Sequence, residues 1–378
     1  MNDKELPLMP EDKNNILLFH PNIPPNAGAE ISKILQTRWI GQGAKVDKFE
    51  KEFSKKFCSD LPCVAVNSGT SALHLAYILS DINKGDEVIC PVFTCTATNI
   101  PLLYLKAKIV FADIDPETMN ISVEDVARKI TDKTKAIVCV HYGGLPCDMD
   151  ELRAFGIPII QDSAHALGAK YRGDELTKLS EFSIYSFQAI KHITTADGGM
   201  LIVNSFECQC DYKKAKRIRW FGIDREAKQK GVWENDITEI GYKYQMTDLA
   251  ATLGLEGLKT FDEILTWRKI LLQHYWFLLR NTPGIKCIGT GAKDVDHAAW
   301  LCTIFAERRD DLIMKLRENG IESGKIHYRN DRYKIFEQFK GDFPNMDKVD
   351  DKYMVLPLHP KITIGDVSRV CQVINSGW

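Results

Sequence analysis

The sequence predicts an α/β fold built on a mostly parallel sheet that helices cover on both faces. Short apolar runs alternate with helix-periodic segments through the middle of the 378-residue chain, which is the pattern of successive βαβ units. Sheets of this kind bury both faces of their strands. Acidic, hydroxyl and histidine side chains follow two of the strand-like runs, at the carboxyl ends where such sheets bind ligands.

The individual elements follow in order from the hydrophobic pattern and the turn residues. Helices are predicted at 71–83, 96–106, 122–134 and 149–156, and strands at 86–91, 108–115, 136–142 and 157–163. The helix at 122–134 has a serine cap, Ser122, followed by Glu124 and Asp125 in its first turn, where carboxylates interact favourably with the helix dipole. Two further buried strands are predicted on either side of residues 186–200.

The pattern changes near residue 250. A long helix-periodic segment at 251–281 is followed by short strand-like pieces and a further helix at 309–320. We therefore predict two domains, 1–255 and 256–378. The first 45 residues are predicted to form an extended arm that leads into a helix and belongs to the larger domain.

Composition excludes several classes of protein. The chain is 44% hydrophobic and 26% charged, with a formal net charge of −2, so no strong field favours nucleic acid or an anionic membrane. No apolar run approaches the roughly 20 residues that span a bilayer, and the polar start has no apolar core of a signal peptide. The 11 cysteines form no C-x-x-C pair, so we expect buried, reduced thiols in a cytoplasmic protein and no zinc site.

One lysine has an unusual position. Lys191 lies in the connection SFQAIKHITTADGGM, between two runs that are predicted to be buried strands, although lysine is almost never buried unless it is paired or chemically employed. Ser186 begins the same stretch, and Asp162 ends an earlier strand in QDSAHALGA. Asp162 could equally be a simple helix cap.

A fourth feature is NSGTSALHLA, in which Gly69 and Thr70 precede a helix. Free backbone N–H groups there would face an anion such as phosphate, although many such turns only cap a helix. Pyridoxal phosphate (PLP) would use all four features: a lysine for a Schiff base, an acid beside the pyridine nitrogen and a phosphate cradle. Lys191 follows Asp162 by 29 residues, which leaves room for one or two strands between them.

Nine stretches of the chain together resemble the DegT/DnrJ/EryC1/StrS family of PLP-dependent aminotransferases of fold type I, often called sugar aminotransferases. In chain order they are RWIGQGAKVDKFEKEF, NSGTSALHLA, GDEVICPVFTCTATN, FADIDPETMNI, QDSAHALGA, SFQAIKHITTADGGM, GYKYQMTDLAAT, IHY and LPLHP. The resemblance covers nearly the whole chain. It implies a large domain with a seven-stranded, mostly parallel sheet, a smaller C-terminal α/β domain, and homodimers that share their active sites.

The resemblance also implies roles for particular residues. Lys191 would form the Schiff base and then move protons, and Asp162 would pair with the pyridine nitrogen. His165 would lie near the phenolic oxygen of the cofactor. Gly69, Thr70 and Ser186 would hold the phosphate.

Other positions depart from the family pattern or lie nearer the substrate. Cys95 stands where relatives commonly stack an aromatic ring on the cofactor, and Phe93 is a candidate replacement. Lys243 stands where an asparagine commonly contacts the phosphate across the dimer; as a cation it would contact that phosphate or, equally, a phosphorylated substrate. Trp220, His327 and Tyr328 are expected at the substrate side. The departures at positions 95 and 243 make the substrate harder to assign from the resemblance, but they do not change the reaction class that it implies.

The expected function is amination of a keto group on a sugar, most simply a nucleotide-linked keto-deoxysugar, with glutamate as donor, in polysaccharide or glycoconjugate biosynthesis. The alternative is the same reaction on a non-nucleotide ketone, such as a keto-cyclitol or a small phosphorylated ketone. Relatives that dehydrate sugars carry histidine in place of the lysine, so Lys191 argues against that activity. A regulator on the same fold would add a nucleic-acid-binding domain, and the sequence shows none.

Overall fold

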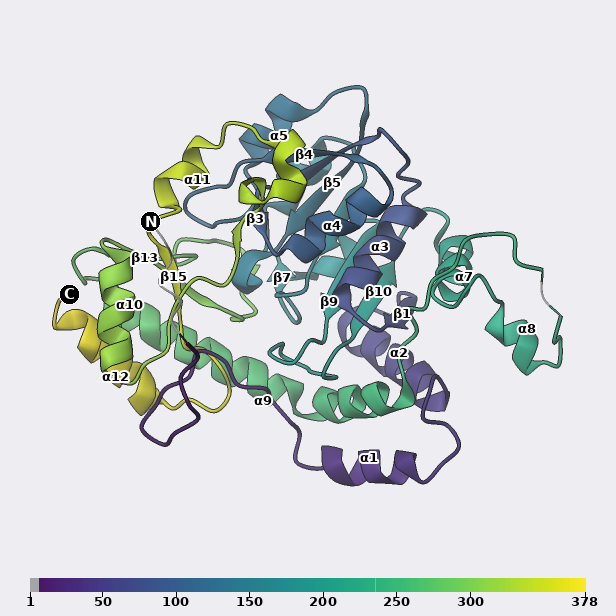
Figure 1. The fold of residues 1–378 in the computed structure, drawn as a ribbon, viewed down its shortest axis with the longest axis horizontal. Coiled ribbons are helices and arrows are strands. Elements are labelled where there is room, and N and C mark those ends of the chain that lie inside the picture. Colours follow the sequence, from purple (N-terminus) through teal and green to yellow (C-terminus); the bar gives the residue numbers. More distant parts are fainter. Residues whose placement is uncertain (1–6, 235) are drawn as a thin grey trace.

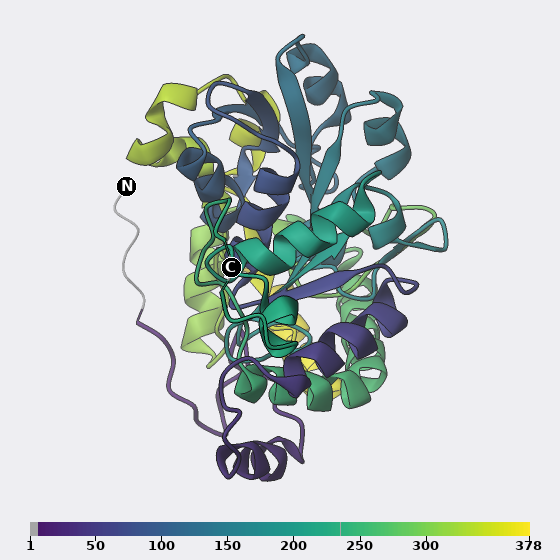
Figure 2. The ribbon, with the colours of Figure 1, turned by 90° about the vertical axis from the view of Figure 1, so that its right-hand side faces the viewer.

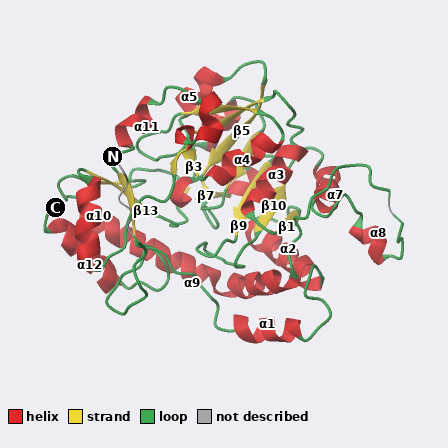
Figure 3. Ribbon diagram, in the orientation of Figure 1, coloured by secondary structure: helices red, strands yellow, loops and turns green. Residues whose placement is uncertain are grey.

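The computed structural model describes residues 7–234 and 236–378 and is built around a seven-stranded sheet (Figures 1 and 3). The strand order is β1-β10-β9-β6-β5-β2-β4. The bounds are β1 Cys63–Val66, β10 Gly199–Val203, β9 Phe182–Ser186, β6 Ile159–Asp162, β5 Thr134–Val140, β2 Glu87–Pro91 and β4 Lys108–Ala112. The strand β10 runs antiparallel to β1 and β9 on either side of it, and the other four pairs are parallel, so the predicted mostly parallel sheet is confirmed.

Helices cover both faces of this sheet, as predicted. Tyr77 of α3 and Leu102 of α4 belong to the core on one face, and Phe49 and Phe53 of α2 belong to the core on the other. The helices of the first face are α3 Gly69–Leu79, α4 Thr96–Tyr104 and α7 Cys208–Ile218; those of the second are α2 Ala44–Phe57, α5 Val123–Lys129, α6 Met149–Ala154 and the first half of α9 Asp248–Leu279.

All the helices and strands predicted between residues 71 and 163 form, and most of these helices are shorter than their predicted ranges. Ser122 caps α5 by accepting a hydrogen bond from Asp125 N. The predicted N-terminal arm differs from the structure, because it contains the helix α1 (Ala27–Leu35). This helix lies beside α9 (Figure 2) and buries Ala27 and Ile34, a tertiary contact that local sequence does not reveal.

A second unit is built on the antiparallel sheet β11-β13-β15. Its core joins Tyr275 of α9, Leu312 of α10 and Val370 of α12. The bounds are β11 Ile285–Cys287, β13 Cys302–Ala306, β15 Tyr353–Leu356, α10 Arg309–Glu318 and α12 Ile364–Asn375. Residue 255 lies inside α9, which packs in both units; the domain division there stays a prediction.

The remaining elements are short. They are α8 Arg225–Gln229, α11 Pro344–Val349, the three-stranded sheet of β12 Val295–Asp296, β7 Lys170–Tyr171 and β8 Asp174–Glu175, and the pair β14 Tyr328–Arg329 and β3 Phe93–Thr94. Within the described residues, no helix has the length and apolar character needed to span a bilayer.

The N-termini of α2 and α9 are joined by one buried carboxylate. Asp248, 2% exposed, accepts backbone hydrogen bonds from Gly43 at 2.7 Å, Val46 at 3.1 Å and Lys45 at 3.2 Å. A Cβ on Gly43 would lie 2.5 Å from the carboxylate, so only glycine permits this approach. The contact satisfies N–H groups that a helix start leaves without intrahelical partners.

Replacing Asp248 by alanine is expected to lower the free energy of unfolding by about 2–4 kcal/mol, because two buried N–H groups and one partly buried N–H group lose a charged acceptor. Asp262 is a matched control on the same helix, since it forms only an exposed ion pair with Lys56, and its alanine variant should lose less than about 1 kcal/mol. Urea unfolding of both variants tests this. Equal losses would show that Asp248 does not cap α2.

Candidate active site

Lys191 is brought to the carboxyl end of the sheet by the hairpin between β9 and β10. The strands pair from Gly199↔Ser186 onward, and the connection bends at Lys191, whose N–H donates to Gln188 O at 2.9 Å. The side-chain amine lies 3.6 Å from the ring centroid of Trp300. Trp300 Nε1 also donates to the carbonyl of Ile190 at 3.2 Å, so the turn and its lysine are both held by one indole.

Burial lowers the pKa of the Lys191 amine from its usual value to about 7, because a low-dielectric surrounding disfavours the charged form. The negative charge of Asp162 and the nearby thiol of Cys95 oppose this shift, and Arg268 adds to it. A lysine with a pKa near 7 is a nucleophile and a proton carrier at neutral pH.

Asp162 ends β6, the strand next to β9. One carboxylate oxygen accepts the hydroxyl of Thr98 at 2.8 Å, and the other accepts the N–H of Ala164 at 3.1 Å. Burial raises the pKa of Asp162, and these hydrogen bonds and Lys191 act against that rise. Among the described residues Asp162 forms no salt bridge, so a cationic ring nitrogen would be its direct ionic partner, with Lys191 acting from farther away.

The first turn of α3 leaves backbone N–H groups without intrahelical partners. Ser68 caps this helix by accepting from Ser71 N at 3.0 Å, while the N–H groups of Gly69 and Thr70 belong to the first turn, which has no intrahelical acceptors. Ser186, at the end of β9, lies against Gly69, where an added Cβ would approach to 3.0 Å from Ser186 Cβ. The helix is therefore capped and also open to an anion.

Three aromatic rings gather beside the lysine. His165 stacks on Trp300 with ring centroids 3.8 Å apart and planes at 19°, and it lies parallel to His327 at 5.2 Å. The Nε2 atoms of the two histidines are 3.4 Å apart. Burial lowers the pKa of both, to about 3 for His327, so both rings are neutral near pH 7.

Trp300 was missed in the sequence analysis. It is 1% exposed and lies in an apolar run before β13, where a tryptophan is normally a core residue. Only the packing of the second unit against the large sheet places it beside Lys191.

Tyr328 reaches the site through β14, which pairs with β3 so that Tyr328 lies opposite Thr94. Cys95 is half-buried at the start of α4. Phe93 does not take the place of an aromatic at position 95, because its ring packs in the core against Tyr142 and Tyr353.

Lys243 and Trp220 lie beside the end of β1. The side chain of Asn67 donates to Lys243 O, and Trp220 and Lys243 are bridged through their backbones. With its carboxamide oriented to satisfy both donors, Gln245 accepts from Lys243 Nζ at 2.9 Å and from Trp220 Nε1 at 3.1 Å. No described contact joins either side chain to Lys191, so their contacts with cofactor and substrate stay predictions.

A group of possible metal ligands that the sequence analysis missed lies behind the site. Cys139, His141 and Cys147 are buried, with ligand atoms within 4.8 Å of one another, because the turn after β5 folds back on that strand. Both ring nitrogens of His141 are engaged, by Gln161 Oε1 at 2.7 Å and Cys147 N at 3.0 Å. All 11 cysteines are free thiols, and most are buried, as predicted.

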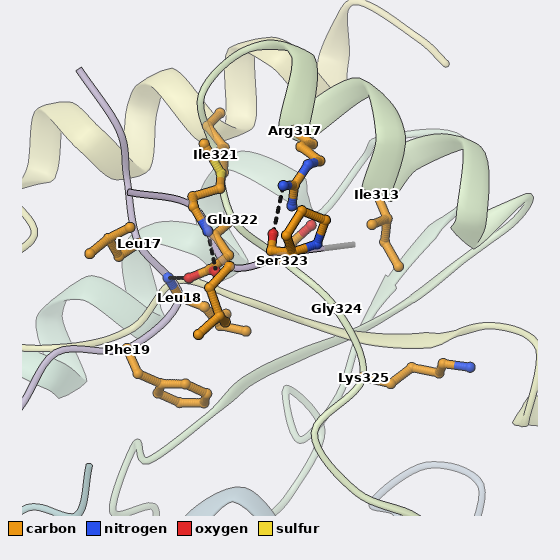
Figure 4. Close-up of a pocket in the computed structure, with 13 residues that line it drawn as sticks. Leu17, Leu18, Phe19, Ile313, Arg317, Ile321, Glu322, Ser323, Gly324 and Lys325 are labelled. Carbon is orange, nitrogen blue, oxygen red and sulfur yellow. Dashed lines mark hydrogen bonds between the residues drawn. The ribbon is translucent and has the colours of Figure 1, made fainter. Parts of the chain in front are cut away.

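A cavity of about 490 Å³ lies under the N-terminal arm and does not include Lys191 (Figure 4). Glu322 ties the arm down by accepting from Met9 N and Leu18 N. Phe19 of the same arm lines this cavity and stacks on Trp300 at 6.1 Å, so the arm also borders the site.

The residues around Lys191 fit PLP. An amine with a lowered pKa, a buried carboxylate without a salt bridge and a helix start with free N–H groups meet at one edge of the sheet. His165 Nδ1 and Ser163 Oγ are also buried without a hydrogen-bond partner among the described residues, which is unusual for buried polar atoms. A polar cofactor would satisfy such atoms.

Comparisons with known proteins agree with this arrangement. The sequence model of the DegT/DnrJ/EryC1/StrS aminotransferase family matches residues 22–375. GDP-perosamine synthase of Escherichia coli O157:H7 is 30% identical, over 95% of this chain and 98% of its own length. The crystal structure of the sugar aminotransferase CalS13 from Micromonospora echinospora superposes with a TM-score of 0.90 at 30% identity, over 96% of this chain and all of CalS13.

Structures of Spr1654 from Streptococcus pneumoniae, in PLP and PMP forms, superpose with a TM-score of 0.89 at 28% identity, covering 96% of this chain and 98% of theirs. The family match spans nearly the entire sequence. The chain therefore belongs to the DegT/DnrJ/EryC1/StrS aminotransferase family.

Proposed function

We propose that this PLP-dependent aminotransferase aminates a keto group of a nucleotide-linked sugar. The observation that carries the proposal is that Lys191, in the turn after β9, acts electrostatically on the buried Asp162 at the end of the adjacent strand β6. Support for a sugar substrate comes from relatives named sugar aminotransferase and GDP-perosamine synthase, and the second name supports a nucleotide-linked one.

PLP supplies an electron sink that makes the hydrogen on the carbon bearing nitrogen acidic. Gly69, Thr70 and Ser186 would hold its phosphate at the start of α3, where N–H groups and the helix dipole favour an anion. Asp162 would hold the proton on the ring nitrogen. Thr98 keeps the carboxylate of Asp162 in place through its hydroxyl.

Lys191 would bind the cofactor covalently and then carry the proton between two carbon atoms. Its pKa near 7 means that the amine accepts a proton and releases it at similar cost at neutral pH. The ring of Trp300, on which His165 stacks, covers one side of this amine. Cys95 would border the cofactor ring, and His327 and Tyr328 would border the substrate.

The amino donor is proposed to be glutamate, and the product to enter polysaccharide or glycoconjugate biosynthesis in the cytoplasm. The competing substrate class is a ketone without a nucleotide, such as a keto-cyclitol or a small phosphorylated ketone. Lys325 and Arg332 lie 5.0 and 4.7 Å from the ring of Tyr328, so two cationic side chains would border the proposed substrate side. This charge favours an anionic substrate over a neutral cyclitol.

A substrate panel tests the proposal. Purified protein with PLP and glutamate is given a nucleotide-linked keto-deoxysugar, a keto-cyclitol and a small phosphorylated ketone, and 2-oxoglutarate release is measured. We expect the highest kcat/KM with the nucleotide-linked sugar and no release by Lys191→Ala. Preferential turnover of the cyclitol would overturn the substrate class, and activity of Lys191→Ala would overturn the lysine's role.

The Asp162→Asn variant is expected to lose on the order of 10³-fold in kcat. An amide cannot hold the charge on the ring nitrogen, so the electron sink weakens. Thr98→Val is the graded control: it keeps the carboxylate and removes only one hydroxyl donor, so its loss should be about tenfold. A turnover of Asp162→Asn equal to that of Thr98→Val would contradict the role of the carboxylate.

We also propose that the active protein is a homodimer. The segment that contains α8 exposes five large apolar side chains between 46% and 80%, and soluble monomers rarely gather such groups. They are Phe221, Val232, Trp233, Ile237 and Ile240. Lys243 is exposed at the end of this segment, where a neighbouring subunit would meet it.

Subunit exchange tests whether Lys243 acts across the dimer. Mixed dimers of Lys191→Ala and Lys243→Ala chains should contain one site with both lysines intact, so part of the activity should return. The Lys243→Ala homodimer should bind PLP or an anionic substrate more weakly, with a smaller difference at high salt. Confirmed mixed dimers without recovered activity would place Lys243 in its own chain's site or outside any site.

A further inference from the structure

Trp300 connects several parts of the site. Its indole face contacts the amine of Lys191 and the ring of His165, and its N–H donates to the carbonyl of Ile190, directly before the lysine. Its own backbone is fixed as well, because Trp300 N donates to Gly143 O at 2.9 Å. A side chain buried to 99% and anchored at both ends cannot move aside without disturbing the loop that carries the lysine.

We propose that Trp300 is a positioning residue for Lys191: its indole holds the free side-chain amine and favours the protonated amine, and its N–H fixes the lysine turn. This inference rests on the proposed function, in which Lys191 is the lysine that binds PLP. It assigns a role to the second unit of the fold, because Trp300 directly precedes β13.

The chemistry explains why an indole suits this place. Transamination requires a lysine that leaves the cofactor and still carries a proton at a defined point. Burial alone would drive the amine to its neutral form, whereas the negative face of an indole attracts an ammonium group, most strongly where water is excluded. The indole face of Trp300 therefore both shields the Lys191 amine from water and attracts its ammonium form.

The charge on Lys191 depends on every group that faces it. Asp162 of β6 and Cys95 at the start of α4 favour the ammonium, and Arg268 of α9 opposes it. His165 and His327 border the same space and are neutral, because burial and the charge of Lys191 lower the pKa of each. None of these five side chains changes in a Trp300 variant, so a shift between variants reports the indole.

The experiment measures how fast PLP-free protein attaches PLP covalently, followed by absorbance between pH 5.5 and 9. Only the neutral amine attacks the aldehyde, so the rate rises through the pKa of Lys191, with a midpoint near 7 in the unaltered chain. Trp300→Leu keeps an apolar contact but no π face, and its midpoint should fall by roughly half to one and a half pH units. Trp300→Phe should shift less.

Trp267 provides matched controls. Its indole N–H also donates to a backbone carbonyl, Ile362 O at 3.1 Å, and it packs on the core of the second unit away from Lys191. Trp267→Phe and Trp267→Leu should leave the midpoint unchanged. Thermal unfolding of all four variants identifies any that do not fold, and Trp300→Phe carries the test if Trp300→Leu is one of them.

The midpoints of the Trp300 and Trp267 variants decide whether the indole favours the ammonium form of Lys191. Midpoints that fall in the order Trp, Phe, Leu at position 300, with unchanged controls, support the inference. Unchanged or higher midpoints in the Trp300 variants overturn it, since the indole then does not favour the ammonium. The proposed function fails separately, if borohydride reduction of the unaltered chain followed by peptide mapping finds PLP on a lysine other than Lys191.

Discussion

The parallel pairing of β6 with β9 is the constraint on which the site depends. Its register, Asp162↔Ile184, sets the depth at which the carboxylate of Asp162 lies relative to the end of β9. Two residues later β9 ends at Ser186, against the first turn of α3, and the chain then turns through Lys191. The acid, the first turn of α3 and the amine are therefore spaced by one strand pair, which is rigid compared with loops, and by the turn that follows β9.

This spacing has an energetic cost, because it removes an amine and a carboxylate from water. Burial lowers the pKa of Lys191 and raises that of Asp162, so each group moves toward its neutral form, and their mutual attraction offsets only part of the shift. His165 Nδ1 and Ser163 Oγ add buried polar atoms without partners among the described residues. A site that is this poorly satisfied by the protein itself is stabilised by a charged, polar cofactor.

The second unit completes the site. Trp300 comes from the segment that leads into β13, His327 and Tyr328 come from the segment after α10, and α9 packs in the cores of both units. Rings from the second unit therefore lie against a lysine of the first. A change in how the two units pack would alter the burial of Lys191 and thus its reactivity.

Most of the architecture and of the central chemistry could be predicted from the sequence. Strands and helices of the large sheet follow from local hydrophobic period and turn residues, and the parallel sheet then brings strand ends, and so Asp162 and Lys191, to one edge. Anion binding at Gly69 and Thr70 was predicted from the pattern of NSGTSALHLA, and the resemblance implied that Ser186 joins them at the phosphate; these roles stay predictions, and Ser186 does lie against Gly69.

Only the tertiary structure decided the rest. The position of Trp300 beside Lys191, the core position of Phe93, the helix α1 within the arm and the approach of Cys139, His141 and Cys147 all depend on contacts between segments far apart in the chain or across a turn. The sequence pattern around an apolar residue does not distinguish a residue that packs in a core from one that packs against a reactive amine. The sequence by itself determined the sheet, the edge at which Asp162 lies and the position of Lys191 in the turn after a strand, because these follow from local pattern. The surroundings that set the pKa of Lys191 are decided by how the two units pack.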